Sequence, residues 1–480
     1  KHETGNRDII VAVVDEGVKY DHPDLVDNMW VNEAEKSGQP GVDDDGNGVV
    51  DDVHGYCCSR GNGNITWDQG NFKVVDGHTY WDGDSGHGTH VAGTIAAVNN
   101  NGIGVSGVAG GTGNNDGVRI MSIQIFNGDT SSTLSQNAKG IEYAADNGAC
   151  ILQNSWGYPL QEGQTMSDSD YQSGFSVELS AIRYFVGKSN CSAMQGNIAI
   201  FAAGNDGKAT ADYPGAYNEV IAVTAYAPDG LPTSYTNYKY GCNVSAPGGD
   251  IWLDGRNTYK WEGTVLSTLP SECIDPLTNA PYGTDYGYMQ GTSMACPHVS
   301  GIAALVLSYA LDNGIKLTNT QLNEIITSSV RNIDDRLTGV KPIYIGNMSL
   351  DPYKGNMGTG KIDALMAIQS VRGALCVPAH VGEEVAINIS SLLGDGNIKV
   401  TSHSEYVIPA ETRNRLDIKG DTYFSGKIYL ACHNAGVGVI TVKYIAGGNA
   451  VGGGNTTGGK LMEKDIVLVV RDFNNNAGWM

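Results

Sequence analysis

The chain has 480 residues and a formal net charge of −22, from 30 basic and 52 acidic residues. This length predicts two or three domains, with a large α/β domain possible as one of them. Hydrophobic residues make up 41% of the chain, enough to bury a sizeable core and to argue against disorder throughout. The acidic balance argues against nucleic acid or an anionic membrane surface as a partner.

The nine cysteines are an odd number, so at least one thiol is expected to be unpaired. No CxxC pair occurs, which argues against a zinc ribbon or a thioredoxin-type site. Cys376 and Cys432 could form a disulfide, and a structural pairing would indicate an oxidising compartment. The apolar stretch 302–310 is too short to span a membrane and predicts a buried helix, so no membrane span is expected.

Buried strands and helices alternate along the first three quarters of the chain. The apolar, β-branched run 9–14 (IIVAVV) predicts a buried strand of a parallel sheet that ends at Asp15. Similar runs follow at 119–126, 149–154, 197–203 and 219–225, and helical stretches are expected at 89–99, 135–147, 176–187, 297–311, 318–330 and 361–372. This alternation predicts an α/β domain built on a mostly parallel sheet.

The pattern changes near Gly373, after which short alternating strands replace helical periodicity. Five such strands are expected, within 383–390, 397–402, 427–432, 438–445 and 464–472. They predict a β-sandwich of the size of an immunoglobulin-like module, and residues 447–459 predict a mobile Gly/Asn-rich loop. We therefore expect a first domain at 1–373 and a β-sandwich accessory domain at 374–480.

A glycine-rich turn delivers Ser293 to the start of an apolar helix in the motif GTSMACPHVSG, residues 291–301. Near the positive end of a helix dipole, negative charge on this serine would be favoured. Taken alone, Ser293 is equally consistent with a simple helix N-cap.

His87 lies in GHGTHVAG, residues 86–93, with glycine on both sides that leaves room for a substrate backbone. His90 follows at a spacing that does not match the HExxH zinc helix, so His90 and also His298 are interpreted as packed structural histidines. Asp15 stands at the carboxyl end of a buried strand, where α/β sheets bind ligands and where a carboxylate can orient an imidazole. A turn or helix-capping role is the alternative for Asp15.

Together, these three motifs resemble those of the subtilisin-like serine proteases, with VVDEGV as the aspartate motif. The chain order Asp, His, Ser agrees with that family and differs from chymotrypsin-like and α/β-hydrolase orders. The resemblance covers roughly residues 8 to 370 and leaves out the C-terminal β region. It implies a subtilisin-like three-layer α/β fold and a serine endopeptidase with Asp15, His87 and Ser293 as its catalytic triad.

The resemblance also implies an oxyanion donor and a substrate site. Asn205, in FAAGNDG, matches the family's asparagine that donates its side-chain amide to the oxyanion, although a Gly-Asn tight turn is the alternative. The segment Ser155, Trp156 and Gly157 matches the family's edge strand, which pairs with an extended substrate backbone, and Ala203 and Gly204 are expected to line the same site.

Asp212 precedes a Tyr-Pro pair and matches one wall of the family's first specificity pocket. A carboxylate there would favour Lys or Arg in the substrate. The alternative is a solvated or calcium-binding aspartate, and the loop before it is shorter than is usual in the family.

Structural Ca²⁺ is the expected cofactor, at two loops. The first resembles the beginning of an EF-hand loop, without its closing glutamate because His54 stands there; its ligands would be Asp43, Asp45, Asn47, Val49, Asp51 and Asp52. A solvated acidic loop is the alternative. The second matches the family's calcium loop, with Asp24, Asn99, Asn101, Ile103 and Val105. In the family a further N-terminal segment supplies a ligand, and only 14 residues precede Asp15 here, so the resemblance implies that this second site is incomplete or empty.

The expected partners are protein or peptide substrates, with no nucleic acid and no membrane span, and the chain is expected to be a monomer. The family resemblance and the acidic surface favour a secreted, cell-surface or periplasmic protein in a mature form that lacks its signal peptide and prodomain. A non-catalytic binding or adhesion protein that keeps the fold is the alternative.

Overall fold

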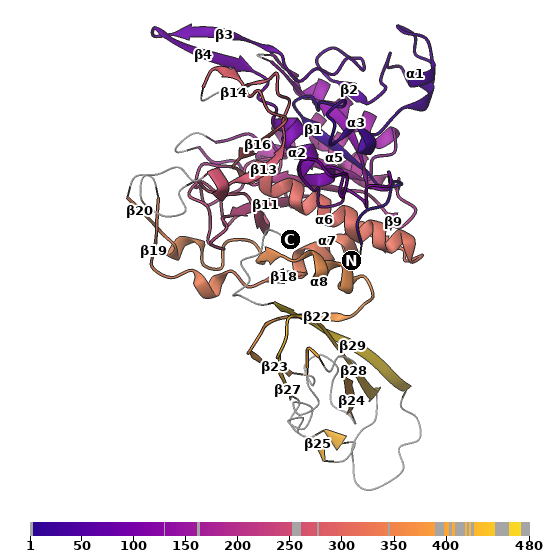
Figure 1. The fold of residues 1–480 in the computed structure, drawn as a ribbon, viewed down its shortest axis with the longest axis vertical. Helices are drawn as coiled ribbons and strands as arrows, with labels where there is room; N and C mark the ends of the chain where they lie inside the picture. Colours follow the sequence, from indigo (N-terminus) through magenta and orange to yellow (C-terminus); the bar gives the residue numbers. More distant parts are fainter. Residues whose placement is uncertain are drawn as a thin grey trace. The chain divides into compact units, whose positions relative to one another are not determined.

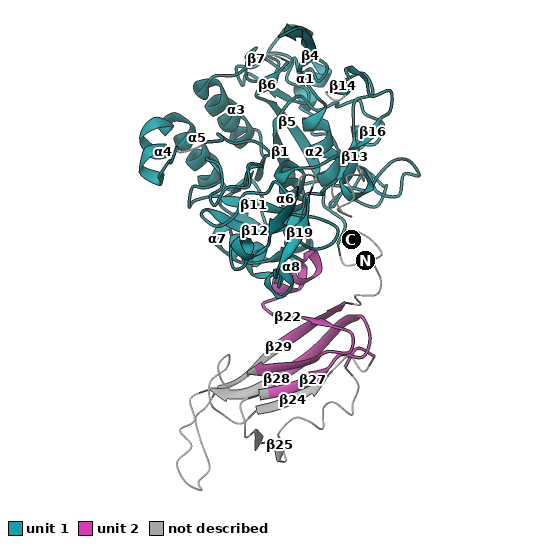
Figure 2. Ribbon diagram, turned by 90° about the vertical axis from the view of Figure 1, so that its left-hand side faces the viewer, with its two compact units in different colours: residues 1–362 teal, residues 363–480 magenta. Residues whose placement is uncertain are grey.

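The computed structural model describes residues 3–128, 130–160, 164–251, 261–275, 278–343, 346–388, 398–402, 406–408, 418–419, 422–423, 427–446 and 460–471. The chain divides into two compact units, residues 1–362 and 363–480 (Figures 1 and 2). The sequence placed the boundary at 373/374. The structure assigns α8 (Ala364–Ser370) to the second unit because Met366 packs there against Val467 and Val469.

Unit 1 is built on a sheet in the order β18-β21-β12-β11-β10-β8-β1-β5-β2. Its strands are β1 (Ile10–Asp15), β2 (Gly55–Cys57), β5 (Arg119–Gln124), β8 (Ile151–Asn154), β10 (Ile198–Ala202), β11 (Ile221–Tyr226), β12 (Cys242–Pro247), β18 (Val330–Arg331) and β21 (Lys361–Ile362). All pairings are parallel except that of β18 with β21. In register, β1 runs from Ile10 opposite Arg119 to Asp15 opposite Gln124, so Asp15 lies at the carboxyl edge of the sheet.

Helices cover both faces of this sheet. The helices in the described part of unit 1 are α1 (Glu33–Ser37), α2 (His87–Ala96), α3 (Leu134–Asp146), α4 (Asp168–Gly174), α5 (Ser176–Gly187), α6 (Thr292–Asp312) and α7 (Asn319–Ser328). Alternate residues of β1, such as Ala12 and Val14, share a core with Ile141 of α3 and Phe185 of α5. Successive strand side chains point to opposite faces, which leaves the other face to α2 and α6, two helices that pack together. The predicted three-layer α/β architecture is confirmed.

Short two-stranded pairs surround the main sheet. They are β3 (Gly70–Val75) with β4 (His78–Gly83), β6 (Phe126–Asn127) with β7 (Thr130–Ser131), β9 (Met194–Gln195) with β17 (Leu317–Thr318), β13 (Val265–Thr268) with β16 (Tyr286–Met289), β14 (Ile274–Asp275) with β15 (Ala280–Pro281), and β19 (Val340–Pro342) with β20 (Asn347–Ser349). The β3–β4 hairpin leads directly toward His87 and projects from the body of the unit (Figure 1).

Unit 2 contains a four-stranded sheet in the order β22-β29-β28-β24 and a separate β23–β27 pair. These strands are β22 (Leu375–His380), β23 (Glu384–Asn388), β24 (Ile398–Ser402), β27 (Lys427–Ala431), β28 (Gly436–Ala446) and β29 (Lys460–Arg471), with a small β25 (Ile418–Lys419) and β26 (Thr422–Tyr423) pair beside them. Ile387 and Ile428 share one core with Ile440 and Leu468, so the two sheets face each other across it. The predicted loop at 447–459 lies outside the described residues.

All nine cysteines are free thiols in this structure, so the suggested Cys376–Cys432 disulfide is not present. The Cys376 thiol instead contacts the Ser370 hydroxyl at 3.4 Å, while Cys432 is buried in the core of unit 2.

Helix α6 is long and apolar enough to cross a membrane by length and composition. However, 89% of its most apolar window is buried inside the structure, because the helix packs against β8, β10, β11 and β12. Burial on this scale is typical of a core helix.

Candidate active site

Asp15 and His87 form a hydrogen-bonded pair at the carboxyl edge of the sheet. The His87 Nδ1–H donates to Asp15 Oδ1 at 2.7 Å, and the backbone N–H of Glu16 donates to the same oxygen at 2.7 Å. Asp15 is 1% exposed. The pair is close because α2 begins against the end of β1: a Cβ on Gly88 would lie 2.4 Å from the Glu16 carbonyl oxygen, so only glycine fits there.

The charges around His87 favour its protonated form. Burial lowers the pKa of His87, but the charge of Asp15, its hydrogen bond and the charge of Glu16 outweigh burial and raise this pKa to about 9. His87 is therefore held by a buried carboxylate that also stabilises the imidazolium.

Ser293 is the second residue of α6, and the cap of this helix is Gly291, so Ser293 is not the N-cap. Gly291 has φ 153° and ψ 161°, a combination that only glycine adopts readily. The Ser293 hydroxyl donates to the Ser155 carbonyl at 3.1 Å, and the Ser155 hydroxyl donates to the Ser293 carbonyl at 2.7 Å. These two reciprocal hydrogen bonds connect α6 to Ser155, in the segment predicted to bind the substrate backbone.

Asn205 lies in the turn after β10 and faces the start of α6. Its side-chain Oδ1 accepts from the Thr292 backbone N–H at 2.8 Å and from the Thr292 hydroxyl at 2.9 Å. A Cβ on Gly291 would lie 3.7 Å from Asn205 Nδ2 and 3.5 Å from the Ser293 backbone nitrogen. The Asn205 amide nitrogen and the Ser293 backbone nitrogen therefore both lie close to Gly291, at the start of α6.

The predicted substrate-binding residues lie on adjoining segments. Gly157 and Gly204 both approach Asp212: a Cβ on Gly204 would lie 2.3 Å from Asp212 Oδ2, and one on Gly157 would lie 2.9 Å from Asp212 Cβ. The Asp212 backbone N–H donates to the Ala203 carbonyl at 2.9 Å. Trp156 is 9% exposed and packs edge-on against Phe201 of β10. The structure thus brings the residues of both segments together around Asp212.

Asp212 is only 6% exposed, so the solvated alternative for this residue is wrong. Its Oδ1 accepts from Asn237 Nδ2 at 3.3 Å. Burial raises the pKa of Asp212 to about 6; the Asp206 charge adds to this effect and the Lys208 charge opposes it. The carboxylate is therefore held in a poorly solvated place with one amide partner and a Lys nearby.

His90 and His298 are packed histidines outside this pair. His90 Nε2 donates to the Val265 carbonyl at 3.0 Å, and His298 Nδ1 donates to the Met294 carbonyl at 2.8 Å. Burial lowers the pKa of His90 to about 3 and that of His298 to about 4. Both rings are neutral at physiological pH and serve as hydrogen-bonded core residues.

The acidic loop gathers only part of its predicted ligand set. Carboxylate oxygens of Asp43, Asp45 and Glu35 all lie within 4.8 Å of one another. Asp51 and Asp52 are outside this group of three. Asp51 accepts from the Gly41 N–H at 3.0 Å, whereas buried Asp52 accepts from the Tyr143 hydroxyl and from the side-chain amides of Asn47 at 2.9 Å and Asn32 at 3.2 Å. Predicted Asn47 accepts the Val49 N–H at 2.7 Å through its Oδ1. Three converging carboxylates suit a hard cation such as Ca²⁺.

Glu35 was missed because it lies in a helix eight residues before the loop. The available signal was an Asn-capped acidic helix, Asn32 followed by Glu33 and Glu35, directly preceding the acidic run.

The second predicted loop surrounds Asp24, which is fully buried. Asp24 accepts from Asn101 Nδ2 at 2.6 Å and from the Val105 N–H at 2.9 Å, while the Ile103 N–H donates to Asn101 Oδ1 at 3.1 Å. Burial raises the pKa of Asp24, against the opposing Val105 N–H. Asn99 Oδ1 is buried and has no hydrogen-bond partner among the residues that the structure describes. The carboxylate of Asp24 and the amide oxygens of Asn99 and Asn101 are ligand types that fit a cation. Among them, Asn99 Oδ1 is the oxygen left without a hydrogen bond in the described structure.

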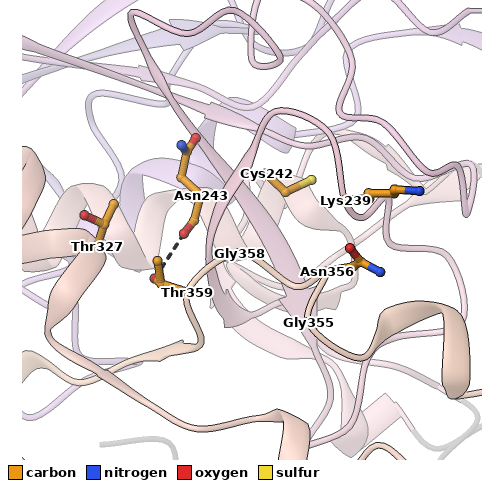
Figure 3. A pocket seen from close by; sticks show the side chains of 8 residues that line it. All are labelled: Lys239, Cys242, Asn243, Thr327, Gly355, Asn356, Gly358 and Thr359. Carbon is orange, nitrogen blue, oxygen red and sulfur yellow. Dashed lines mark hydrogen bonds between the residues drawn. The ribbon is translucent and has the colours of Figure 1, made fainter.

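A cavity of about 310 Å³ lies elsewhere in unit 1 (Figure 3). It is lined by Lys239, Cys242, Asn243, Thr327, Gly355, Asn356, Gly358 and Thr359. Cys242 begins β12, whereas Asp15 ends β1, and the strands from β1 to β12 are parallel. The cavity therefore lies at the opposite edge of the sheet from the Asp15–His87 pair.

Residues 6–359 match the model of the subtilase family, and the chain belongs to that family. The chain is 34% identical over 247 residues to a thermophilic serine proteinase of Bacillus sp. (strain AK1), covering 50% of this chain and 49% of the relative. It is 30% identical over 373 residues to an extracellular basic protease of Dichelobacter nodosus, covering 76% and 51%. The chain thus spans about half the length of these curated relatives.

Among solved structures, the fold resembles that of a protease from Pseudoalteromonas arctica PAMC 21717, with a TM-score of 0.52 and 27% identity. The match covers 77% of this chain and 91% of the other. The family resemblance inferred from the three motifs is therefore confirmed.

Proposed function

We propose that the protein is a serine endopeptidase that hydrolyses peptide bonds through an acyl-enzyme intermediate. The observation that carries this proposal is the 2.7 Å His87–Asp15 hydrogen bond beside a helix that presents Ser293 and a fixed Asn205 amide. In this assignment, Ser293 is the nucleophile, His87 the general base, Asp15 its orienting carboxylate, and Asn205 an oxyanion donor.

Catalysis requires a change at Ser293, whose hydroxyl donates to the Ser155 carbonyl in this structure. Rotation about the Ser293 Cα–Cβ bond would redirect the proton toward His87, and such hydrogen bonds often tighten only when substrate is bound. His87 then accepts the proton as Ser293 attacks the scissile carbonyl carbon. The same proton passes from His87 to the leaving amine, and water repeats the sequence to release the acid.

Charge that develops on the carbonyl oxygen would be stabilised by Asn205 and the Ser293 backbone N–H. The Asn205 amide is prevented from turning because its oxygen is held by both donors of Thr292. Donors fixed in advance cost little reorganisation during the reaction.

For the substrate, we propose backbone pairing along Ser155 to Gly157 and along Ala203 and Gly204, with Asp212 selecting Lys or Arg. Strand addition accepts many sequences because main-chain hydrogen bonds provide the affinity. The buried Asp212 carboxylate would supply the sequence preference, because a cationic side chain would satisfy it better than the neutral Asn237 amide does.

We also propose two structural Ca²⁺ sites. Asp43, Asp45 and Glu35 would hold one ion, and Asp24 with Asn101 and the nearby loop would hold the other. Bound Ca²⁺ would neutralise the clustered charges and cross-link each loop.

We further propose that the protein acts outside the cytoplasm as a monomer. One relative is described as an extracellular basic protease. The net charge of −22 suits a protein that stays dispersed in solution.

Hydrolysis of a denatured, fluorescently quenched protein substrate tests the proposed function. Wild-type protein is expected to release fluorescence, and Ser293→Ala to abolish release. Ser308→Ala is the matched control, because this serine lies on the same helix and its hydroxyl donates to the helix carbonyl of Ala304. Absence of hydrolysis by folded, Ca²⁺-supplied wild type would favour the non-catalytic binding alternative.

A further inference from the structure

Glu16 follows Asp15 directly and reaches the start of the helix that carries His87. Its carboxylate accepts from the Ser85 backbone N–H at 2.9 Å, the His87 backbone N–H at 2.9 Å and the Ser85 hydroxyl at 3.2 Å. The cap position of α2 is Gly86, which has no side chain to accept from the first-turn N–H groups. Glu16, the residue directly after β1, therefore supplies the capping acceptor that Gly86 lacks.

The same carboxylate contributes to the field around the imidazole. Burial raises the pKa of Glu16 to about 7, the His87 charge opposes this rise, and the charges of Asp84 and Asp15 add to it. The Glu16 charge is in turn one of the causes that raise the pKa of His87. Burial raises the pKa of Cys273 and of Tyr282, and the charge of Glu16 adds to this rise in both.

We propose that Glu16 is a positioning residue for His87: its carboxylate clamps the backbone at the start of α2 and places a second negative charge beside the imidazole. Asp15 holds the ring through Nδ1, whereas Glu16 holds the backbone of the same residue. Asp15 thus holds the ring of His87, and Glu16 holds its backbone. Asp15 is the last residue of β1, and Glu16 directly follows it.

The negative charge of Glu16 should affect the pH at which His87 titrates. A negative charge favours the imidazolium, so removal of the Glu16 charge should let His87 lose its proton at lower pH. Glu16→Gln is the informative variant, because its amide oxygen can still accept N–H bonds while the charge is lost. Glu16→Ala removes both.

An NMR titration of the His87 ring in the Ser293→Ala background tests this proposal without requiring activity. With Glu16→Gln added, the pKa of His87 should fall by about half a unit to one unit, the effect of one nearby, partly screened charge. Glu33→Gln is the matched control, because Glu33 is exposed on α1, and should leave the titration unchanged. An unchanged His87 pKa in Glu16→Gln would overturn the proposal.

A kinetic test, which rests on the proposed peptidase function, distinguishes the effect of the Glu16 charge from that of its hydrogen bonds to the backbone. In Glu16→Gln, the acid limb of kcat/KM for a short peptide should move to lower pH by the same half unit to one unit, with a plateau within about threefold of wild type. In Glu16→Ala, the plateau itself should fall by on the order of tenfold because His87 loses its backbone clamp. If wild type hydrolyses nothing, the proposed function fails while the NMR titration still decides the role of Glu16. Equal profiles in wild type and Glu16→Gln would contradict the proposal.

Discussion

Replacing Asp212 with Asn should remove the proposed preference of the site for basic substrates. Asp212 is 6% exposed and lies against Gly204 and Gly157, so an incoming cation would meet its carboxylate in surroundings largely free of water. A unit charge about 4 to 6 Å away, at an effective dielectric constant of about 20, gains roughly 3 to 4 kcal/mol. Desolvation of the cation offsets part of this gain and leaves on the order of 2 kcal/mol, or roughly 30-fold in kcat/KM.

The assay compares kcat/KM for paired fluorogenic peptides that differ only in Arg or Leu before the scissile bond. Asp212→Asn should lower the Arg-to-Leu ratio by roughly 30-fold, mainly through the Arg peptide. Asp206→Asn is the matched control, since this neighbouring acid is exposed and paired with Lys208 at 3.0 Å. Its ratio should change by less than about threefold, as expected for a screened surface charge.

The same ratio should depend on pH. Because the pKa of Asp212 is raised to about 6, the carboxylate is ionised above that pH and neutral below it. The Arg preference should therefore be present at pH 7 to 8 and decline as the pH falls through about 6. A ratio that is insensitive to both Asp212→Asn and pH would refute the assignment of Asp212 as the specificity residue.

Three further predictions address the oxyanion donor, the acidic loop and the core. Asn205→Ala should lower kcat by about a hundred- to a thousand-fold with little change in KM, a magnitude measured on a member of this same family; a loss below tenfold would count against the role. Chelation of Ca²⁺, or Glu35→Gln, should lower the melting temperature by several degrees, whereas Glu33→Gln on the same helix should not; an unaltered melting curve after chelation would contradict the calcium sites. Phe185→Ala, at a fully buried site facing α3 and the sheet, should lower the free energy of unfolding by about 3 to 5 kcal/mol in a urea titration, and a cost below about 1 kcal/mol would show that the core is misassigned.

The parts of the fold that the sequence predicted are those with continuous apolar runs. The run at 9–14 became β1, and the helical stretch at 176–187 became α5 with the same bounds. By contrast, β12 (Cys242–Pro247) was missed, because its sequence CNVSAP is half polar and ends in proline. Its burial comes from pairing with β11 and β21, a tertiary effect that no local pattern records.

The β3–β4 hairpin was also missed, although its turn carried a signal. Asp76 and Gly77 adopt φ 51° and 80°, as a two-residue turn between strands requires, and Asp-Gly is a strong sign of such a turn. Its flanking strands are largely exposed, so no alternation of buried and exposed residues marked them.

At the candidate site, long motifs located Asp15, His87, Ser293 and Asn205, but they did not predict how these residues are held. Thr292 fixes the Asn205 amide and Glu16 caps α2 through contacts between segments distant in sequence, whereas Glu35 joins the acidic loop from a helix eight residues before it. Asp51 and Asp52 showed the converse: their spacing suited a metal loop, yet the Gly41 N–H binds Asp51, and Tyr143 together with the Asn32 and Asn47 amides binds Asp52. Sequence spacing predicts which residues lie in the same loop. The hydrogen-bond partners of each side chain determine its orientation within that loop.

Covalent labelling can show whether Ser293 is a nucleophile activated by His87. Incubation with a fluorophosphonate probe, followed by digestion and mass spectrometry, measures this directly. The expected result is one adduct per chain, located on Ser293, absent in Ser293→Ala and strongly reduced in His87→Ala. A folded, Ca²⁺-supplied protein that gains no adduct, or an adduct that persists in Ser293→Ala, would contradict the claim.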